Sequence, residues 1–302
     1  MGISQFIGNR VEKSNISCKT FLVTVFGDVI SQHGQWVWLG SLIEVLSNLG
    51  YSERLVRTSV FRLVKDDWLQ VKKVGRKSYY SLTENANNHY TKAARRIYSA
   101  TRKHDDDRWL IVIPSFVDET QLVQFKRQLK WLGFSSLASG VYAHPFADRS
   151  SLNATLKELN LQNSVVVLSA KITDKNSLAV LKKQVHEKWN LNWLDDQYSQ
   201  FFNTYQKQYD LIKKEKNKIS SEQSFLVRLL LIHEYRRILL KDNELSSSML
   251  PIDWSGYKAH SLSKDLYALL SKQSQSYIVN SLKNIDGCLP KASAEFNDRF
   301  RH

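Results

Sequence analysis

Between residues 54 and 65, positively charged side chains recur at helical spacing, together with a hydroxyl and an aromatic ring. Successive residues of a helix are turned by about 100°, so this stretch divides into an apolar face and a mixed face. In the major groove of DNA a guanidinium pairs with guanine O6 and N7, and threonine or an apolar group meets the thymine methyl. The pattern favours a helix that reads bases, although a solvated basic face with Phe61 packed under a neighbour remains the alternative. The residues that we predict for this role, besides Phe61, are Arg54, Arg57, Thr58, Ser59, Arg62 and Lys65.

A second basic cluster follows at once, around Gly75. It lies between two β-prone runs, residues 68–74 and 78–82, which predict a hairpin. A basic hairpin tip fits a contact to DNA phosphate or to the minor groove. A charged tip also protects a strand edge from unwanted pairing, so this reading stays open. The predicted contact residues are Lys73, Arg76 and Lys77, with Lys72 beside them.

The elements that would position both clusters form a recognisable order. Apolar periodicity predicts helices over residues 20–30 and 39–49, then a third from Ser52 as N-cap to about 67, the hairpin, and a last helix over 83–103. This is the order of a winged helix-turn-helix domain, which we assign to residues 18–103. Residues 1–104 hold 16 of the 43 Lys and Arg but only 7 of the 29 Asp and Glu. A polyanionic partner therefore fits this part of the chain.

The pattern changes after the acidic run Asp105–Asp107, which reads as a solvated linker. Strand, helix, two short strands, helix and strand follow, the order of a ferredoxin-like βαββαβ domain over residues 104–177. Residues 178–302 read as a mostly helical C-terminal part for effector binding or dimerisation. The fold class predicted is α+β. The expected segments in the last two parts are strands 109–113, 134–144 (two) and 165–172, and helices 118–132, 150–159, 178–189, 195–216, 221–241 and 261–284.

Sequence motifs along residues 18–257 resemble one family. Residues 56–68 and 75–83 resemble the winged-helix domain of the phenylacetate-catabolism repressors, the PaaX-type transcriptional regulators. Leu132-Gly-Phe134 with 140–145 is similar to the central domain of that family, and 233–237 with 250–256 to its C-terminal signature. The chain departs from the pattern at Asp67, where the family usually has Gly, and at Asn243 and Ser255, where it usually has Pro.

The resemblance implies a dimeric repressor that binds a palindromic operator in double-stranded DNA and is released by phenylacetyl-CoA. An acyl-CoA needs cations for its phosphates and an apolar slot for its acyl group. One predicted C-terminal helix carries several cations, and the loop after it carries a tryptophan. We interpret these residues either as such a ligand site or as a contact between domains. The candidates are Arg228, His233, Arg236, Arg237 and Trp254.

An enzyme is the competing class. Ferredoxin-like domains of this type resemble the Cas2-like nucleases, which place a catalytic Asp at the end of the first strand. Here that strand runs into Pro114-Ser115-Phe116, with no acid to hold a metal. P-loop, G-x-G-x-x-G, G-x-S-x-G and H-E-x-x-H motifs are missing as well. We therefore expect no enzyme, no cofactor and no metal, with a metal-dependent nuclease as the alternative.

Location in the cell is predicted from what the chain lacks. Its start shows no charged region followed by an apolar one, and no apolar run approaches the length of a membrane span. Its two cysteines, Cys18 and Cys288, are far apart in sequence, which argues against a disulfide framework. A cytoplasmic protein without membrane contact is expected.

Overall fold

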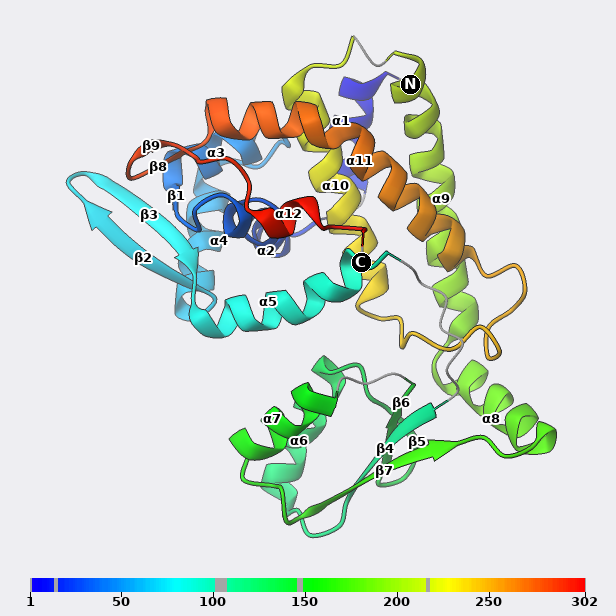
Figure 1. Cartoon of the computed structure of the whole chain (residues 1–302). Coiled ribbons are helices and arrows are strands. Elements are labelled where there is room, and N and C mark those ends of the chain that lie inside the picture. Colours follow the sequence, from blue (N-terminus) through cyan, green and yellow to red (C-terminus); the bar gives the residue numbers. More distant parts are fainter. Residues whose placement is uncertain (1, 14–15, 101–107, 146–148, 216–217, 302) are drawn as a thin grey trace. The chain divides into compact units, whose positions relative to one another are not determined.

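The computed structural model describes residues 2–13, 16–100, 108–145, 149–215 and 218–301, and the acidic run Asp105–Asp107 lies outside them. Helices and strands both contribute, as the α+β class requires (Figure 1). The described residues group into two compact units. The described residues of the first unit fall in the ranges 1–101, 201–237 and 259–302. Those of the second unit fall in the ranges 102–200 and 238–258. The division into three domains stays a prediction.

The N-terminal part of the first unit follows the expected order closely. One further helix, α1, precedes it at Ile3–Lys13, in a stretch for which we predicted no element. The elements that follow are α2 (Cys18–Asp28), a 3-10 turn (Ile30–Gln32), β1 (Val37–Trp38), α3 (Leu39–Ser47), α4 (Glu53–Lys65), β2 (Leu69–Val74), β3 (Lys77–Leu82) and α5 (Glu84–Ile97).

Helix α4 has the boundaries that its sequence dictates. Its N-cap is Ser52, whose side chain accepts a hydrogen bond from the backbone N–H of Leu55 at 3.3 Å. Glu53 lies in the first turn, where a negative charge is favourable. The helix ends just before Asp67, whose φ of +57° is left-handed. Glycine adopts such a positive φ without a steric penalty, so a non-glycine residue at this position is strained.

The hairpin forms a three-stranded antiparallel sheet of order β1-β3-β2. Val74 of β2 pairs with Lys77 of β3, and the turn between them contains Gly75 at φ +56°. Strand β2 is therefore an edge strand. Helix α2 packs against α4, and its side chains Phe21, Leu22 and Val25 are fully buried.

The second unit contains a four-stranded antiparallel sheet of order β5-β6-β4-β7. One face of this sheet packs on two helices around Val112, Phe125 and Leu156. Asp118 caps the first of these helices by accepting a hydrogen bond from the backbone of Gln121. The bounds are β4 (Arg108–Pro114), α6 (Glu119–Trp131), β5 (Ser135–Ala138), β6 (Val141–His144), α7 (Arg149–Glu158), β7 (Val165–Lys171) and α8 (Lys175–Lys188).

Long helices make up most of the remaining chain. Residues 201–237 and 259–302 belong to the same compact unit as the N-terminal part. The small hairpin and the last helix were not predicted. These elements are α9 (Leu191–Lys214), α10 (Ser221–Leu239), α11 (Ser255–Ser281), β8 (Lys283–Asn284), β9 (Gly287–Cys288) and α12 (Ala294–Asn297).

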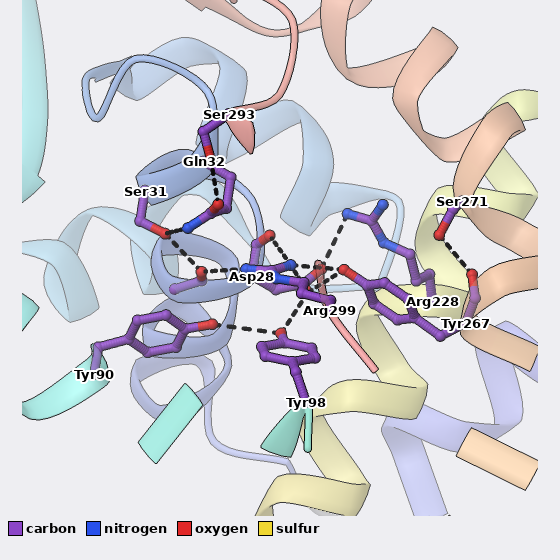
Figure 2. Close-up of polar contacts among 11 residues, drawn as sticks. Asp28, Ser31, Gln32, Tyr90, Tyr98, Arg228, Tyr267, Ser271, Ser293 and Arg299 are labelled. Atoms are coloured by element: carbon purple, nitrogen blue, oxygen red, sulfur yellow. Dashed lines mark hydrogen bonds and ion pairs between the residues drawn. The ribbon is translucent and has the colours of Figure 1, made fainter. Parts of the chain in front are cut away.

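Asp28, at the end of α2, is the centre of a buried polar network in the first unit (Figure 2). Its Oδ2 accepts from Arg228 of α10 at 3.0 Å. Its Oδ1 accepts from Arg299 at 2.8 Å, from Tyr98 at 2.6 Å and from Tyr267 of α11 at 3.0 Å. Burial is the largest influence and raises the pKa of this carboxyl, but attraction to Arg228 and Arg299 and the hydrogen bonds from the two phenols together outweigh it, so the pKa lies below its usual value.

Replacing Asp28 by asparagine should destabilise the protein severely. The substitution removes the negative charge at the centre of this network and leaves the guanidinium groups of Arg228 and Arg299 buried together. Breaking one side of a buried ion pair costs about 3–5 kcal/mol. The measurement is the free energy of unfolding in urea for Asp28→Asn.

The matched control is Asp66→Asn, because Asp66 forms an ion pair with Lys19 at the surface, where its side chain is 45% exposed. Exposed pairs contribute about 0–1 kcal/mol. Equal losses in the two variants would contradict a central role for the buried network.

Candidate nucleic-acid interface

The two faces of α4 differ as its spacing predicts. Val56, Val60 and Leu63 are buried and face the interior. Phe61 is 69% exposed, the largest exposed apolar side chain of this helix. The residues that surround it on the solvent face are all exposed: Arg54, Arg57, Thr58, Arg62 and Lys65.

Ser59 does not belong to this exposed face. It is only 5% exposed, and it lies about 200° around the helix from Arg57. Its hydroxyl hydrogen-bonds the thiol of Cys18 in α2, and this bond partly offsets the increase in the pKa of Cys18 that burial causes. Ser59 is predicted from the sequence as a groove residue, whereas the structure buries it on the packing side of the helix.

Two residues of the exposed face have partners within the helix. The guanidinium of Arg57 pairs with Glu53 one turn earlier, with Nη2 and Oε1 2.7 Å apart. The hydroxyl of Thr58 donates to the carbonyl oxygen of Arg54 at 2.8 Å. An exposed pair of this spacing contributes only about 0.2–0.5 kcal/mol, so a phosphate or a base can displace Glu53 at little cost.

The hairpin presents exposed cations along its edge strand and turn, at Lys72, Lys73 and Arg76. Lys77 differs, because its ammonium lies over the ring of Trp38 at 5.0 Å from the centroid. This cation–π contact orients the side chain and competes with any contact to a phosphate.

Most of these cations lack a neutralising carboxylate. Within the part of the chain that the structure describes, no ion pair engages Arg54, Arg62, Lys65, Lys72, Lys73 or Arg76. A face with unpaired positive charge and hydrogen-bond donors attracts an anionic polymer. This arrangement is what an interface with nucleic acid requires.

Four of the five residues proposed for an effector are buried or partly buried. Arg228 has no exposed surface and pairs with Asp28. Trp254 lies in the other compact unit, where its ring meets Tyr198 edge-on at 5.9 Å. Among the five candidates, Arg237 is the only exposed side chain.

His233 and Arg236 share one partner on α2, Thr24. Arg236 Nη1 donates to Thr24 Oγ1 at 2.8 Å, and His233 Nδ1 lies 2.8 Å from the same oxygen. We assign the hydroxyl proton to the bond with Nδ1, which leaves the histidine proton on Nε2. In the described part of the chain Nε2 has no hydrogen-bond partner. With Arg228, these contacts connect α10 to α2 at two points, Thr24 and Asp28.

Sequence reasoning found Arg228, His233 and Arg236 but missed the residues that they contact. Asp28 and Thr24 are the partners on α2, and Arg299 completes the network. One signal was present in the sequence. A carboxylate that ends an otherwise apolar helix is seldom buried unless it is paired, so Asp28 implied a cation elsewhere in the chain.

At the end of β4, where the nuclease alternative requires an acid, the structure shows other side chains. Strand β4 ends at Pro114, and exposed Phe116 follows shortly after. Among the described residues, no cluster of three or more His, Cys, Asp or Glu has the geometry to hold a metal ion. The described helices include none with the length and apolar character needed to cross a membrane.

The buried state of His233 predicts a specific pH dependence. Burial, followed by repulsion from Arg236 and Arg237, lowers its pKa to about 3, whereas an unfolded histidine titrates near pH 6.5. Between these values the unfolded chain binds more protons, so stability should fall as the pH is lowered from about 6.5. His233→Asn keeps an acceptor near the position of Nδ1 but cannot titrate. It should reduce the slope of unfolding free energy against pH, by up to about 1.4 kcal/mol per unit.

The exposed His186 provides the control for this measurement. If His233→Asn and His186→Asn both retain the wild-type slope between pH 4 and pH 6.5, then His233 is not held neutral in the folded protein.

Comparisons with known proteins cover nearly the whole chain. The family model described as PaaX-like protein matches residues 17–86. The model of the PaaX protein central Cas2-like domain matches residues 102–181, and that of the PaaX-like protein C-terminal domain matches residues 189–280.

Individual relatives agree with these matches. The chain is 32% identical over 298 residues to the transcriptional repressor PaaX of Escherichia coli (strain K12), which covers 99% of this chain and 94% of the relative. Among solved structures, the uncharacterized protein Rv0674 from Mycobacterium tuberculosis matches 82% of this chain and 94% of its own, with a TM-score of 0.50 and 18% identity, a likeness of fold alone. With all three regions matched in order, the chain belongs to the PaaX family of transcriptional repressors.

Proposed function

We propose that this protein is a cytoplasmic, ligand-responsive repressor of an aromatic-acid operon for phenylacetate catabolism, and that it binds a palindromic operator as a dimer. The observation that carries the proposal is the exposed face of α4, where unpaired cations surround a hydroxyl and an aromatic ring. Membership of a repressor family supports the same reading. The name of that family supports the phenylacetate pathway.

In this proposal α2 to α5 form a winged helix-turn-helix domain, with α4 as the recognition helix and the β2–β3 hairpin as the wing. Arg54, Arg57, Thr58, Arg62 and Lys65 then face base edges and flanking phosphates. Ser59 is left out because it is buried. The wing residues Lys73, Arg76 and Lys77 contact the DNA backbone or the minor groove, and Lys77 must first leave Trp38.

The proposed effector is phenylacetyl-CoA, and the candidate residues divide between two roles. The exposed Arg237 is suited to a phosphate of the ligand. Arg228, His233 and Arg236 are suited to transmit binding, because they contact Asp28 and Thr24 of α2. A ligand that prefers one arrangement of α10 would thereby favour one arrangement of the proposed DNA-binding domain. The role of Trp254, which packs on Tyr198, is to support the loop before α11.

A gel shift tests the function directly. The DNA is the region upstream of the protein's own gene cluster, with excess random competitor, at near-physiological salt. We expect a complex that survives competition and dissociates when phenylacetyl-CoA is added, but not with free phenylacetate or free CoA. A complex that ignores all three compounds would overturn the proposed effector, and absence of a specific complex would overturn the repressor.

Arg237→Ala separates ligand binding from DNA binding. The variant should hold operator DNA as tightly as the wild type but need more phenylacetyl-CoA for release, because a phosphate contact is lost. Lys207→Ala, another exposed cation of the same compact unit, is the control. Equal effector requirements in both variants would remove Arg237 from the site.

Substitutions in α4 and in the hairpin should affect DNA binding in different ways. Arg62→Ala should cost about 1–3 kcal/mol of binding to the operator and relax base preference, if Arg62 reads a guanine. Arg76→Ala should weaken operator and random DNA alike and reduce the salt dependence by about one phosphate contact. Both are read from binding titrations on the two DNAs at several salt concentrations. If Arg62→Ala also weakens both DNAs equally, Arg62 contacts phosphate instead of a base.

A further inference from the structure

Phe61 has no apparent structural role within the protein. Its side chain is 69% exposed near the centre of the solvent face of α4. The ring contacts of the described part of the chain do not include it. Leu55, also exposed at 44%, is on the same helix but lies about 120° around its axis. On the solvent face of α4, Phe61 is thus an isolated aromatic side chain with no other exposed apolar side chain of this helix beside it.

The surroundings of Phe61 select the kind of partner that can cover it. On the helix it lies between Arg57 one turn before and Lys65 one turn after, with Arg54 and Arg62 alongside. Protein-binding patches combine several apolar side chains, and a single one among cations does not make such a patch. A partner that covers Phe61 must also accept the desolvation of these cations, so it must carry closely spaced negative charge.

DNA meets both requirements at once. Its phosphates pair with the flanking cations, and the floor of its major groove offers one apolar group, the C5 methyl of thymine. A helix lying in the groove directs the middle of its exposed face at the base edges. A side chain that wedges between base steps usually enters the minor groove, where this helix would not lie.

We propose that Phe61 is a specificity residue that packs against a thymine methyl group in the operator. The inference rests on the proposed function, because it requires α4 to lie in a major groove. It differs from the roles of the arginines, which read guanine or phosphate by hydrogen bonds. Phe61 selects thymine by apolar contact, and cytosine, which lacks the methyl, is rejected.

The test removes the methyl groups without knowledge of the operator sequence. The upstream fragment is amplified once with dTTP and once with dUTP, so that the two DNAs differ only in the thymine C5 methyls. Binding of each is measured for the full-length wild type and for Phe61→Ala, Phe61→Leu and Leu55→Ala. The ratio of thymine-DNA to uracil-DNA affinity is compared between the wild type and each variant. This double-substitution cycle cancels any general effect of uracil on the duplex.

The wild type should bind thymine DNA more tightly than uracil DNA by about fourfold for each methyl contacted, the equivalent of one buried methylene. Phe61→Ala should bind thymine DNA on the order of tenfold more weakly than the wild type and should no longer distinguish the two DNAs. Phe61→Leu keeps an apolar side chain and should retain part of the discrimination. Leu55→Ala should discriminate as the wild type does. Because Phe61 is exposed, its variants should unfold at the wild-type urea concentration, which excludes a folding defect.

Two results would overturn the proposal while leaving the repressor intact. The first is equal binding of both DNAs by the wild type. The second is unchanged discrimination in Phe61→Ala, which would assign the methyl contact to another residue such as Thr58. If the wild type fails to bind the thymine fragment specifically, then the proposed function itself is wrong, and the inference fails with it.

Discussion

A carboxylate without access to water organises the larger of the two compact units. Asp28 accepts hydrogen bonds from two guanidinium groups and two phenols, contributed by distant parts of the chain. The rings of Tyr98 and Phe296 lie against the guanidinium of Arg299. Their centroids are 4.1 Å and 5.1 Å from the Cζ atom of Arg299. Taking such charges out of water is costly, and the cost is recovered only when all partners are correctly placed. The network therefore rejects arrangements in which α2, α10 and α11 pack with the wrong register.

Helix α2 has contacts of two chemical kinds. Its apolar residues, such as Phe21 and Val25, pack in the core that also receives α4. Thr24 and Asp28, one turn apart, carry the polar contacts to α10. Apolar packing permits small adjustments, whereas hydrogen-bonded ion pairs are either made or broken. A displacement of α10 would thus reach α4 through α2, the element that both share.

The sequence predicted local structure well because local chemistry specifies it. Ser52 and Glu53 begin α4, and Gly75 turns the hairpin, so each could be found from neighbouring residues alone. The buried position of Ser59 also follows from periodicity, although it stands among the residues predicted for the groove. The pairing of Asp28 with Arg228 and Arg299 could not be found in this way, because 200 and 271 positions separate these residues from Asp28. Helix α12 has only four residues, too few for periodicity, whereas α1 carries Ile3, Phe6 and Ile7 at helical spacing, a signal that our prediction does not use.

The distance along the chain between Asp28 and Arg299 also has a consequence for biosynthesis. Ribosomes add about 5–20 residues per second, so the 271 positions between these partners take on the order of tens of seconds to translate. Throughout that time the carboxylate lacks Arg299, one of its two cations. The nascent chain can form α4 early, but it completes the buried network around Asp28 only after Arg299 has been made. A chain that stops before Arg299 would therefore lack part of the network that fixes α2, the helix on which α4 packs.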